Sequence, residues 1–509
     1  MSPNETIAAQ RQVECSAADV YRDQPSSLLR REQHVEYLAQ IFTRALPKSF
    51  ACLNAGRPWV CYWVCHGLYL LDAIDGIDAT AMTSFLASCQ HETGGFGGGP
   101  GQLPHLATTY AAVSALVTLG TDEALAVIDR EKMLEFFLRQ CRSPEQGGGM
   151  TMHDGGEVDV RGCYCALCAC YVLGLDGRQV VEACDMGRFV RACQGHEGGI
   201  GGEPGNEGHG GYGFCAYGAL ALAESCGWLS NATRMIDRSL LVSWVTRMQG
   251  HVEGGMRGRT NKLVDGCYSW WCGGLCRLLA NGGVGVGGKE VIVESVENAE
   301  NVEKGDRARP RKGNTRLADA VQAWCDNQSN QRNVLLALES ELDETMEQYV
   351  ATEERIQQRD IQSGADPLSL TDVEEVKRLG EDAVQLQNEI EELEEHIRCV
   401  EDSTACLRRL LMAVDGSNKN DNPKQLIDMN ALQMWALLAC QVPGKGGLRD
   451  KPGTHQDFYH TCYVLSGISA AQEVSGTVGG AANRLRPAHP IVNVGIDRIE
   501  RSIAFFARA

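Results

Sequence analysis

A phrase built around paired glycines recurs five times along the chain. In each copy an apolar stretch, often ending in Cys-Gln, precedes the pair, and a tyrosine follows 14 to 17 residues later. The pairs are Gly94-Gly95, Gly147-Gly148, Gly198-Gly199, Gly254-Gly255 and Gly446-Gly447. Their starts lie 53, 51, 56 and then 192 residues apart. Self-similarity at a period of about 50 residues is typical of repeat architectures, in which one supersecondary unit stacks on the next.

Each unit predicts a helix, a glycine-rich turn and a second helix. The stretches before the glycines, such as 133–138, have helical composition and no proline. The stretches after them, such as 110–116, are almost entirely small or apolar, so a helix there must be buried on most sides. We therefore expect an all-α fold, an α/α barrel (toroid) of helical-hairpin repeats with apolar helices inside. Its glycine-rich turns should gather at one end, where backbone can approach a ligand closely.

The last gap exceeds the period by about 140 residues, and this excess coincides with an acidic segment. Residues 281–420 hold 30 Asp and Glu against 16 Lys and Arg, which is −14 of the chain's net −19. The expected organisation is a polar N-terminal tail over 1–30, a barrel over 31–280 and 427–509, and an acidic insertion over 281–426. Residues 282–288 and 301–315 predict a flexible linker within the insertion.

Apolar residues at 3,4 spacing predict an inserted helical hairpin or coiled coil. They are Leu335, Leu338, Leu342, Tyr349 and Ile356, then Leu386, Ile390, Leu393, Ile397, Val400, Leu407 and Leu411. A turn signal at 363–367 separates the two sets. Two interpretations remain open: a solvated insertion with no catalytic part, and an arm that docks a partner.

Composition excludes several classes of function. A net charge of −19 argues against a general nucleic-acid binder, because that attraction comes from clustered Lys and Arg. We find no apolar run long enough for a membrane span, no secretion signal and no lipidation motif. The 22 cysteines follow no short fixed spacing, so we expect a cytoplasmic protein whose thiols are mostly core residues.

Asp265, Cys267 and His460 form a candidate metal site. The stretches 261–268 and 457–463 occupy the same phase of two repeats, at the start of an apolar helix. Asp265 and Cys267 can converge only at a helix start, where Gly266 relaxes the backbone. Carboxylate, thiolate and imidazole are zinc ligands, and three protein ligands leave a fourth position open for catalysis. From composition alone, a structural trio remains the alternative.

Basic and aromatic residues lie in or next to the same turns. Arg161, His209, Arg257, Arg259 and Lys262 follow or flank the glycine-rich segments. Such donors suit a diphosphate or a carboxylate, although solvated loop charges would give the same pattern. The aromatic residues at the starts of the apolar helices belong either to the core or to a lipid-lining wall. They are Trp59, Trp63, Tyr110, Tyr164, Tyr212, Tyr268, Trp271 and Tyr463.

Six stretches resemble the protein prenyltransferase beta-subunit family, in particular farnesyltransferase beta subunits. They are 94–106, 159–161, 197–202, 209–212, 261–268 and 457–463. The resemblance covers roughly 30–280 and 427–509 and is collinear across the five repeats. It implies an α/α barrel around an apolar funnel, completed by a helical-repeat alpha subunit. It further implies transfer of farnesyl from farnesyl diphosphate to the cysteine of a C-terminal Cys-a-a-X protein, such as a small GTPase.

The resemblance also implies residue roles. Asp265, Cys267 and His460 match the family's zinc ligands. His209, Arg259, Lys262 and Tyr268 match its diphosphate-binding residues. Trp59, Trp63, Tyr110, Arg161, Tyr164, Tyr212, Cys215, Trp271, Tyr459 and Tyr463 match positions along the isoprenoid and peptide pocket. Asp450 matches a position that can hold Mg²⁺ beside the diphosphate.

Three positions favour farnesyl over longer donors. The geranylgeranyl-transferring relatives have a smaller residue where this chain has Trp59 and a phenylalanine where it has Tyr463. The type I relative has a lysine in place of Asp450. Two other functions remain as alternatives: the beta subunit of a type I geranylgeranyltransferase, and a non-catalytic barrel scaffold that presents the acidic hairpin.

Overall fold

The computed structural model describes residues 3–23, 27–42, 48–281, 340–352, 374–388 and 425–508, together with 338 and 390. The chain divides into two compact units. The first comprises Met1–Val13, Gln24–Val302 and Asn422–Ala509, and the second Glu14–Asp23 and Glu303–Asp421. Within the described ranges the regular elements are helices, and backbone pairing outside them is confined to isolated bridges. The all-α prediction is confirmed.

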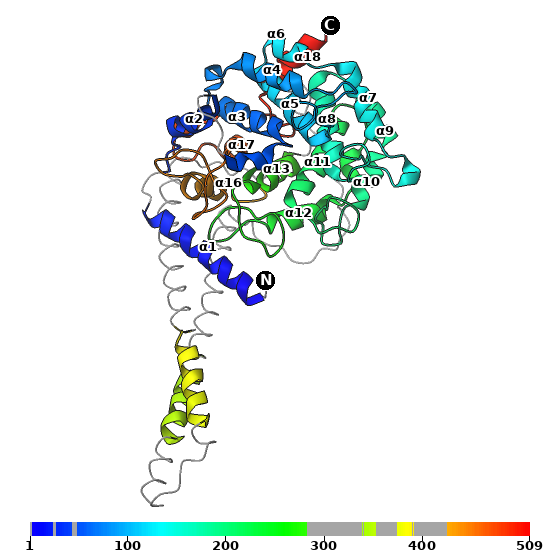
Figure 1. Cartoon of the computed structure of the whole chain (residues 1–509). Helices are drawn as coiled ribbons and strands as arrows, with labels where there is room; N and C mark the ends of the chain where they lie inside the picture. Colours follow the sequence, from blue (N-terminus) through cyan, green and yellow to red (C-terminus); the bar gives the residue numbers. More distant parts are fainter. Residues whose placement is uncertain are drawn as a thin grey trace, which may run out of the picture. The chain divides into compact units, whose positions relative to one another are not determined.

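The core of the first unit is a closed ring of inner helices (Figure 1). They are α3 (Arg57–Leu70), α5 (Leu106–Leu119), α8 (Val160–Leu173), α11 (Gly210–Ser225), α13 (Tyr268–Asn281) and α17 (Phe458–Ser475). Each packs on the next, and α17 packs back on α3. These helices carry the small and apolar sequences, and α5 is buried along almost its whole length.

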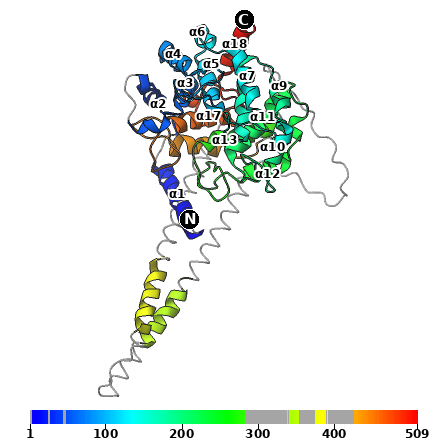
Figure 2. The same cartoon turned by 45° about the vertical axis from the view of Figure 1, so that its right-hand side comes forward.

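An outer layer of helices surrounds this ring (Figure 2). It contains α2 (Arg31–Ala39), α4 (Ala79–Cys89), α7 (Arg130–Gln140), α10 (Met186–Ala192), α12 (Arg238–Thr246) and α16 (Met429–Met434), which continues into the π-helix η6 (Trp435–Ala439). The shorter or peripheral helices are α6 (Asp122–Ala126), α9 (Arg178–Ala183), α18 (Ile496–Phe506), η1 (Gln40–Phe42), η2 (Lys48–Leu53), η3 (Ile74–Gly76), η4 (Pro144–Gln146), η5 (Ala232–Arg234) and η7 (Ala481–Asn483). The predicted α/α toroid is confirmed.

Each turn requires glycine because the next outer helix packs directly against it. A Cβ on the second glycine would lie 2.6–2.9 Å from an aromatic ring of that helix. The contacts are Gly95 with Phe136, Gly149 with Phe189, Gly199 with Trp244, Gly255 with Trp435, and Gly447 with Tyr37 of α2. The last contact joins the fifth repeat to the first. The predicted pair Gly147-Gly148 is wrong by one residue: Gly147 faces open space, and Gly148 and Gly149 make the contacts.

The glutamines that precede the glycines join neighbouring repeats. Gln194 Nε2 donates to the carbonyl of Asp237 at 2.8 Å, and its Oε1 accepts from the Asp237 amide at 2.8 Å. The same pair of bonds recurs between the fourth and fifth repeats. In the fifth repeat Gln441 bonds instead to the first, accepting from the Arg30 amide at 2.8 Å and donating to the Leu28 carbonyl at 3.0 Å. The ring is therefore closed by hydrogen bonds as well as by packing.

The second unit contains two helical segments, 340–352 and 374–388, that lie side by side (Figures 1 and 2). Most of their less exposed positions follow 3,4 spacing. These positions are 338, 342, 345, 349 and 352 on one helix, and 376, 379, 380, 383, 386 and 390 on the other. Paired helices of a coiled coil have this pattern, and the two predicted helices are present over these residues. The predicted linkers, the turn at 363–367, Leu335, Ile356 and the positions from Leu393 to Leu411 lie outside the described residues.

The N-terminal segment, expected as a polar tail, forms helix α1 (Pro3–Asp23).

Two further expectations concern membranes and disulfides. Among the helices that the structure describes, none is both long and apolar enough to cross a bilayer. No disulfide joins the cysteines in the described ranges.

Candidate metal centre

Polar side chains gather at the starts of most inner helices because these helices begin at capping residues. His209 Nδ1 accepts a hydrogen bond from the Gly211 amide at 3.0 Å, and Asp265 Oδ1 accepts from the Cys267 amide at 2.9 Å. The other capping side chains are His105, Asp159 and Asp457. A cap satisfies backbone N–H groups that a helix start leaves unpaired. The repeat therefore places reactive side chain types at equivalent points of the ring.

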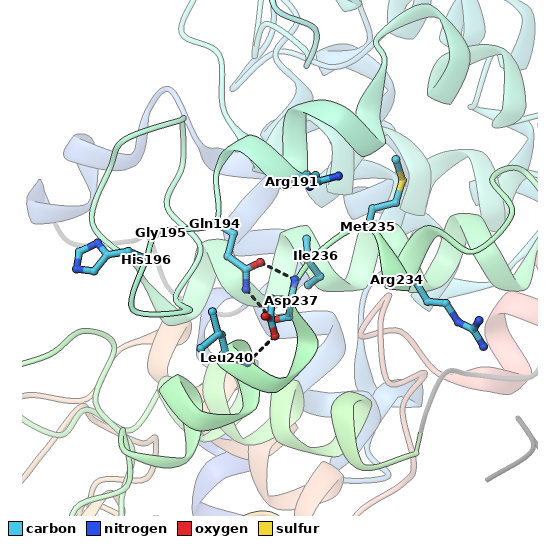
Figure 3. A pocket seen from close by; sticks show the side chains of 9 residues that line it. All are labelled: Arg191, Gln194, Gly195, His196, Arg234, Met235, Ile236, Asp237 and Leu240. Carbon is cyan, nitrogen blue, oxygen red and sulfur yellow. Dashed lines mark hydrogen bonds between the residues drawn. The ribbon is translucent and has the colours of Figure 1, made fainter. Parts of the chain in front are cut away.

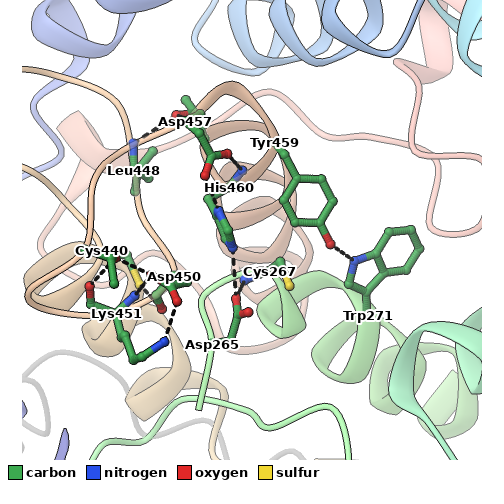
Figure 4. Close-up of polar contacts among 12 residues, drawn as sticks. Asp265, Cys267, Trp271, Cys440, Leu448, Asp450, Lys451, Asp457, Tyr459 and His460 are labelled. Atoms are coloured by element: carbon green, nitrogen blue, oxygen red, sulfur yellow. Dashed lines mark hydrogen bonds and ion pairs between the residues drawn. The ribbon is translucent and has the colours of Figure 1, made fainter. Parts of the chain in front are cut away.

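Asp265, Cys267 and His460 are brought together at one such point (Figure 4). Their ligand atoms all lie within 4.8 Å of one another, and His460 Nε2 is 3.3 Å from Asp265 Oδ1. The backbone of Gly266 makes this possible. A Cβ there would lie 2.8 Å from the Arg449 carbonyl oxygen, so a larger residue would push the Asp265–Cys267 turn away from the segment that contains Arg449.

Two carboxylates hold the imidazole of His460. Asp457 Oδ2 lies 2.6 Å from its Nδ1, and Asp457 Oδ1 accepts from its backbone amide at 2.7 Å. Burial alone would lower the pKa of His460, but the bonds to Asp265 and Asp457 outweigh it and raise the pKa to about 10. Burial likewise opposes ionisation of Asp265, yet the bonds from His460 and the Cys267 amide give a net lowering of its pKa. The site therefore favours a positive charge at Nε2.

The arrangement fits a zinc ion. Three different donor types contribute one atom each, with separations that metal–ligand bonds of about 2.0–2.3 Å can span. Asp457 stands behind the imidazole, where a second-shell carboxylate fixes ring orientation and basicity. Sequence reasoning missed Asp457. Its signal is its position, since it caps α17 three residues before His460.

A cluster of basic residues and Tyr268 flanks the Asp265–Cys267 stretch in the sequence. Tyr268 comes directly after Cys267, and its hydroxyl is 2.9 Å from His209 Nε2. Arg259 forms an ion pair with Glu207 at 3.1 Å. Burial and the neighbouring Arg259 both lower the pKa of His209, so the imidazole is neutral at pH 7. Lys262 is exposed on the same turn as Arg259. Glu207 was not singled out from the sequence.

The predicted pocket residues lie on the inner helices, and several of their aromatic rings contact one another. Ring centroids are 5.8 Å apart for Trp59 and Trp63, 5.7 Å for Trp59 and Tyr110, and 4.6 Å for Trp271 and Tyr463. Cys215 is buried on α11. Arg161 makes a bidentate contact with the capping Asp159 and lies over the ring of Tyr212. Tyr459 packs edge-on against Trp63.

Tyr110 and Tyr164 have a structural role that the sequence did not predict. Their hydroxyls donate to the carbonyls of Val492 at 2.8 Å and Ile491 at 2.6 Å. Tyr62 continues the series by donating to the Asn493 carbonyl at 2.8 Å. Three consecutive carbonyls of a C-terminal segment therefore bond to the inner helices α3, α5 and α8. Both predicted pocket tyrosines are 3% exposed, and their hydroxyls are already used.

Asp450, the predicted magnesium position, is engaged within the protein. Its carboxylate accepts from Lys451 Nζ at 2.5 Å and from the hydroxyl of Thr454. A divalent cation at this carboxylate would have to displace the lysine ammonium. The backbone of Asp450 also supports the metal site, because its carbonyl accepts from the Gly266 amide at 2.6 Å.

A separate hollow of about 410 Å³ lies on the outer layer, between the end of α10 and the start of α12 (Figure 3). The carboxylate of Asp237 caps α12, and the backbone amide of Asp237 donates to Gln194 Oε1. His196 points to the opposite side from Arg191 and Arg234, so the basic groups do not converge. None of its lining residues belongs to the Asp265, Cys267 and His460 group.

Comparison with known proteins agrees with this fold and site. The model of the prenyltransferase alpha-alpha toroid domain matches residues 29–494. Protein farnesyltransferase subunit beta of Arabidopsis thaliana is 34% identical over 505 residues, covering 97% of this chain and 86% of that protein. The subunit of the same name from Pisum sativum is 32% identical and covers 94% of each chain. Geranylgeranyl transferase type-1 subunit beta of Arabidopsis thaliana is 31% identical over 50% of this chain and 73% of its own length.

A solved structure shares the fold. Candida albicans protein geranylgeranyltransferase-I complexed with GGPP matches with a TM-score of 0.51 at 15% identity, over 94% of this chain and 98% of that chain. The near full-length relatives and the family model together establish the family. The chain belongs to the protein farnesyltransferase beta-subunit family of prenyltransferase alpha-alpha toroids.

Proposed function

We propose that this chain is the catalytic beta subunit of a zinc-dependent protein farnesyltransferase. It transfers farnesyl from farnesyl diphosphate to the cysteine thiol of proteins ending in Cys-a-a-X, as a heterodimer with an alpha subunit in the cytoplasm. The observation that carries the proposal is the Asp265, Cys267 and His460 cluster, whose ligand atoms lie within 4.8 Å beside the basic cluster. The names of the near full-length relatives support the same reaction.

The metal-binding side chains prepare the nucleophile. A zinc ion held by Asp265, Cys267 and His460 would take the substrate thiol at its open position and favour its deprotonation to the thiolate. Asp457 accepts the Nδ1 proton of His460, which leaves Nε2 directed at the site. The thiolate attacks C1 of the farnesyl group, a carbon–sulfur bond forms, and the bond from C1 to the diphosphate oxygen breaks.

The basic cluster balances the charge of the leaving diphosphate. His209 Nδ1 accepts from a backbone amide, so its neutral ring carries the proton on Nε2 and donates it to the Tyr268 oxygen. Tyr268 therefore keeps its own O–H to donate to a diphosphate oxygen. Arg259 and Lys262 supply two positive charges on the same turn. Mg²⁺ at Asp450 is a further part of the proposal, and its binding would release Lys451 toward the diphosphate.

Donor length is the feature that separates this proposal from its main alternative. Trp59 and Tyr463 add aromatic bulk to the interior of the inner ring, where a fourth isoprene unit would need space. The geranylgeranyl transferase type-1 subunit of Arabidopsis thaliana is 31% identical, so transfer of the longer geranylgeranyl group remains the alternative function.

The test is co-expression with the alpha subunit, followed by transfer assays with farnesyl and geranylgeranyl diphosphates and a peptide ending in Cys-a-a-X. We expect transfer with a preference for farnesyl. A preference for geranylgeranyl would assign the type I activity instead. An intact heterodimer that transfers neither group would favour the scaffold alternative.

A further inference from the structure

We propose that Arg449 is a positioning residue of the metal centre: its side chain anchors the short segment 448–450, which joins the two turns that carry the metal ligands. One turn carries Asp265 and Cys267, and the other carries His460. The inference rests on the zinc site of the proposed function and extends it to a residue that contributes no ligand atom.

The segment is bonded to the start of α17, which carries His460 (Figure 4). The Leu448 carbonyl accepts from the Asp457 amide at 3.2 Å, and the Leu448 amide donates to the Thr461 hydroxyl at 2.9 Å. Asp457 precedes His460 in the chain, and Thr461 follows it directly. A shift of Leu448 would therefore shift the imidazole with it.

The same segment is bonded to the turn that carries the other two ligands. Gly266 lies between Asp265 and Cys267, and its amide donates to the Asp450 carbonyl at 2.6 Å. The preceding carbonyl, that of Arg449, packs against the same glycine, because a Cβ on Gly266 would lie 2.8 Å from its oxygen. The position of the segment therefore sets the separation between the imidazole and the other two ligands.

Arg449 anchors this segment to the end of an outer helix. Its amide donates to the Cys440 carbonyl at 2.9 Å, and its Nε donates to the Ala439 carbonyl at 3.1 Å. Ala439 is the last residue of the π-helix η6, and both Ala439 and Cys440 are fully buried. Helical turns of this kind are rare and occur frequently at functional sites. The guanidinium therefore pairs a buried carbonyl that water cannot reach.

The side-chain bond is a particular feature of the fifth repeat. The first three repeats have Gly97, Thr151 and Gly201 at the position two residues after the glycine pair. The fourth has Arg257, whose amide donates to the Met248 carbonyl at 2.8 Å in the same way. The Nε of Arg257, however, has no hydrogen-bond partner among the residues that the structure describes. Only the arginine beside the metal-binding turns bonds to its outer helix through Nε in this part of the chain.

A matched pair of variants separates this hydrogen bond from the charge of the guanidinium. Arg449→Gln keeps an N–H donor as far from the backbone as Nε, and Arg449→Met keeps the length without a donor. Both variants remove the positive charge. Arg178→Met is the control for the loss of an arginine-to-carbonyl bond elsewhere, because Arg178 donates to the Gly227 carbonyl at 2.9 Å.

The measurements use the heterodimer. Zinc affinity is determined by competition with a chelator, and the visible absorption of the Co²⁺-substituted proteins reports the geometry of the ligands. Melting temperatures report whether each variant is folded. We expect Arg449→Met to weaken zinc binding by about tenfold and to change the Co²⁺ spectrum. Arg449→Gln and Arg178→Met should keep the wild-type affinity and spectrum.

Two results would overturn the inference while leaving the zinc site intact. One is a folded Arg449→Met protein with wild-type affinity and spectrum. The other is an equal loss of affinity in Arg449→Gln, because the charge and not the hydrogen bond would then be responsible. If Arg449→Met does not assemble, wild-type zinc binding by Arg449→Gln supports the inference and a tenfold loss overturns it. A wild type that binds no zinc would overturn the proposed function and this inference together.

Discussion

Removing the side-chain amide of Gln441 should destabilise the ring more than the same change in another repeat. Gln441 Oε1 accepts from the Arg30 amide and from His34 Nε2, both at 2.8 Å, and its Nε2 donates to the Leu28 carbonyl at 3.0 Å. Gln441 is 1% exposed, so water cannot replace these partners. Methionine has a similar length and no amide, so Gln441→Met isolates the hydrogen bonds from the packing.

The size of the effect follows from the partners left unpaired. A buried polar group without a partner lowers the free energy of unfolding by about 1–3 kcal/mol. Because the surrounding structure can relax in part, three such groups should lower it by about 3 kcal/mol. Gln194→Met is the matched control, because Gln194 makes similar bonds to Asp237 at a more exposed position and should cost about 1 kcal/mol. Thermal melts of the heterodimer compare the two variants at pH 7. Equal shifts, or a larger shift for Gln194→Met, would refute the ring-closure reasoning.

Three shorter predictions concern the donor site and pH. Glu207→Gln should release Arg259 and tighten farnesyl diphosphate binding several-fold in an equilibrium assay, and unchanged or weaker binding would contradict a restraining role. Burial lowers the pKa of His66 from 6.5 to about 4, so the unfolded chain takes up the extra proton first and stability falls as the pH drops from 6.5 toward 4. His66→Gln, which can still bond to Asn493, should show a smaller loss of melting temperature between pH 7 and pH 5, and an identical loss would reject this origin. Trp59→Thr should shift donor preference toward geranylgeranyl diphosphate, and an unchanged ratio of the two rates would remove Trp59 as a length determinant.

The repeat structure could be predicted because its cause is local. Each glycine pair marks a turn that an aromatic ring of the next outer helix covers, so the pattern in the sequence is the pattern of packing. The register of the second pair failed because three glycines stand in a row and only the contact with Phe189 distinguishes them. The sequence also indicated that Asp265 and His460 occupy equivalent positions in two repeats, because both lie at the start of an inner helix.

What the sequence could not predict depends on contacts between distant segments. Tyr110 bonds to a carbonyl 382 residues away, and Gln441 bonds to an amide 411 residues away. Neither pairing leaves a spacing signal, because a backbone carbonyl or amide has no sequence identity. The roles of Asp457 and Glu207 were missed because an acidic residue near a helix start or in a loop is ordinarily a cap or a solvated charge.

The central claim is that Asp265, Cys267 and His460 form a zinc site. The most direct test is the zinc content of the purified heterodimer, measured for the wild type, Cys267→Ala and Cys272→Ala. Cys272 is a buried thiol on α13 outside the ligand group and serves as the control. We expect one zinc ion per chain in the wild type and in Cys272→Ala, and close to none in Cys267→Ala. A wild type without zinc, or a Cys267→Ala protein that retains a full equivalent, would contradict it.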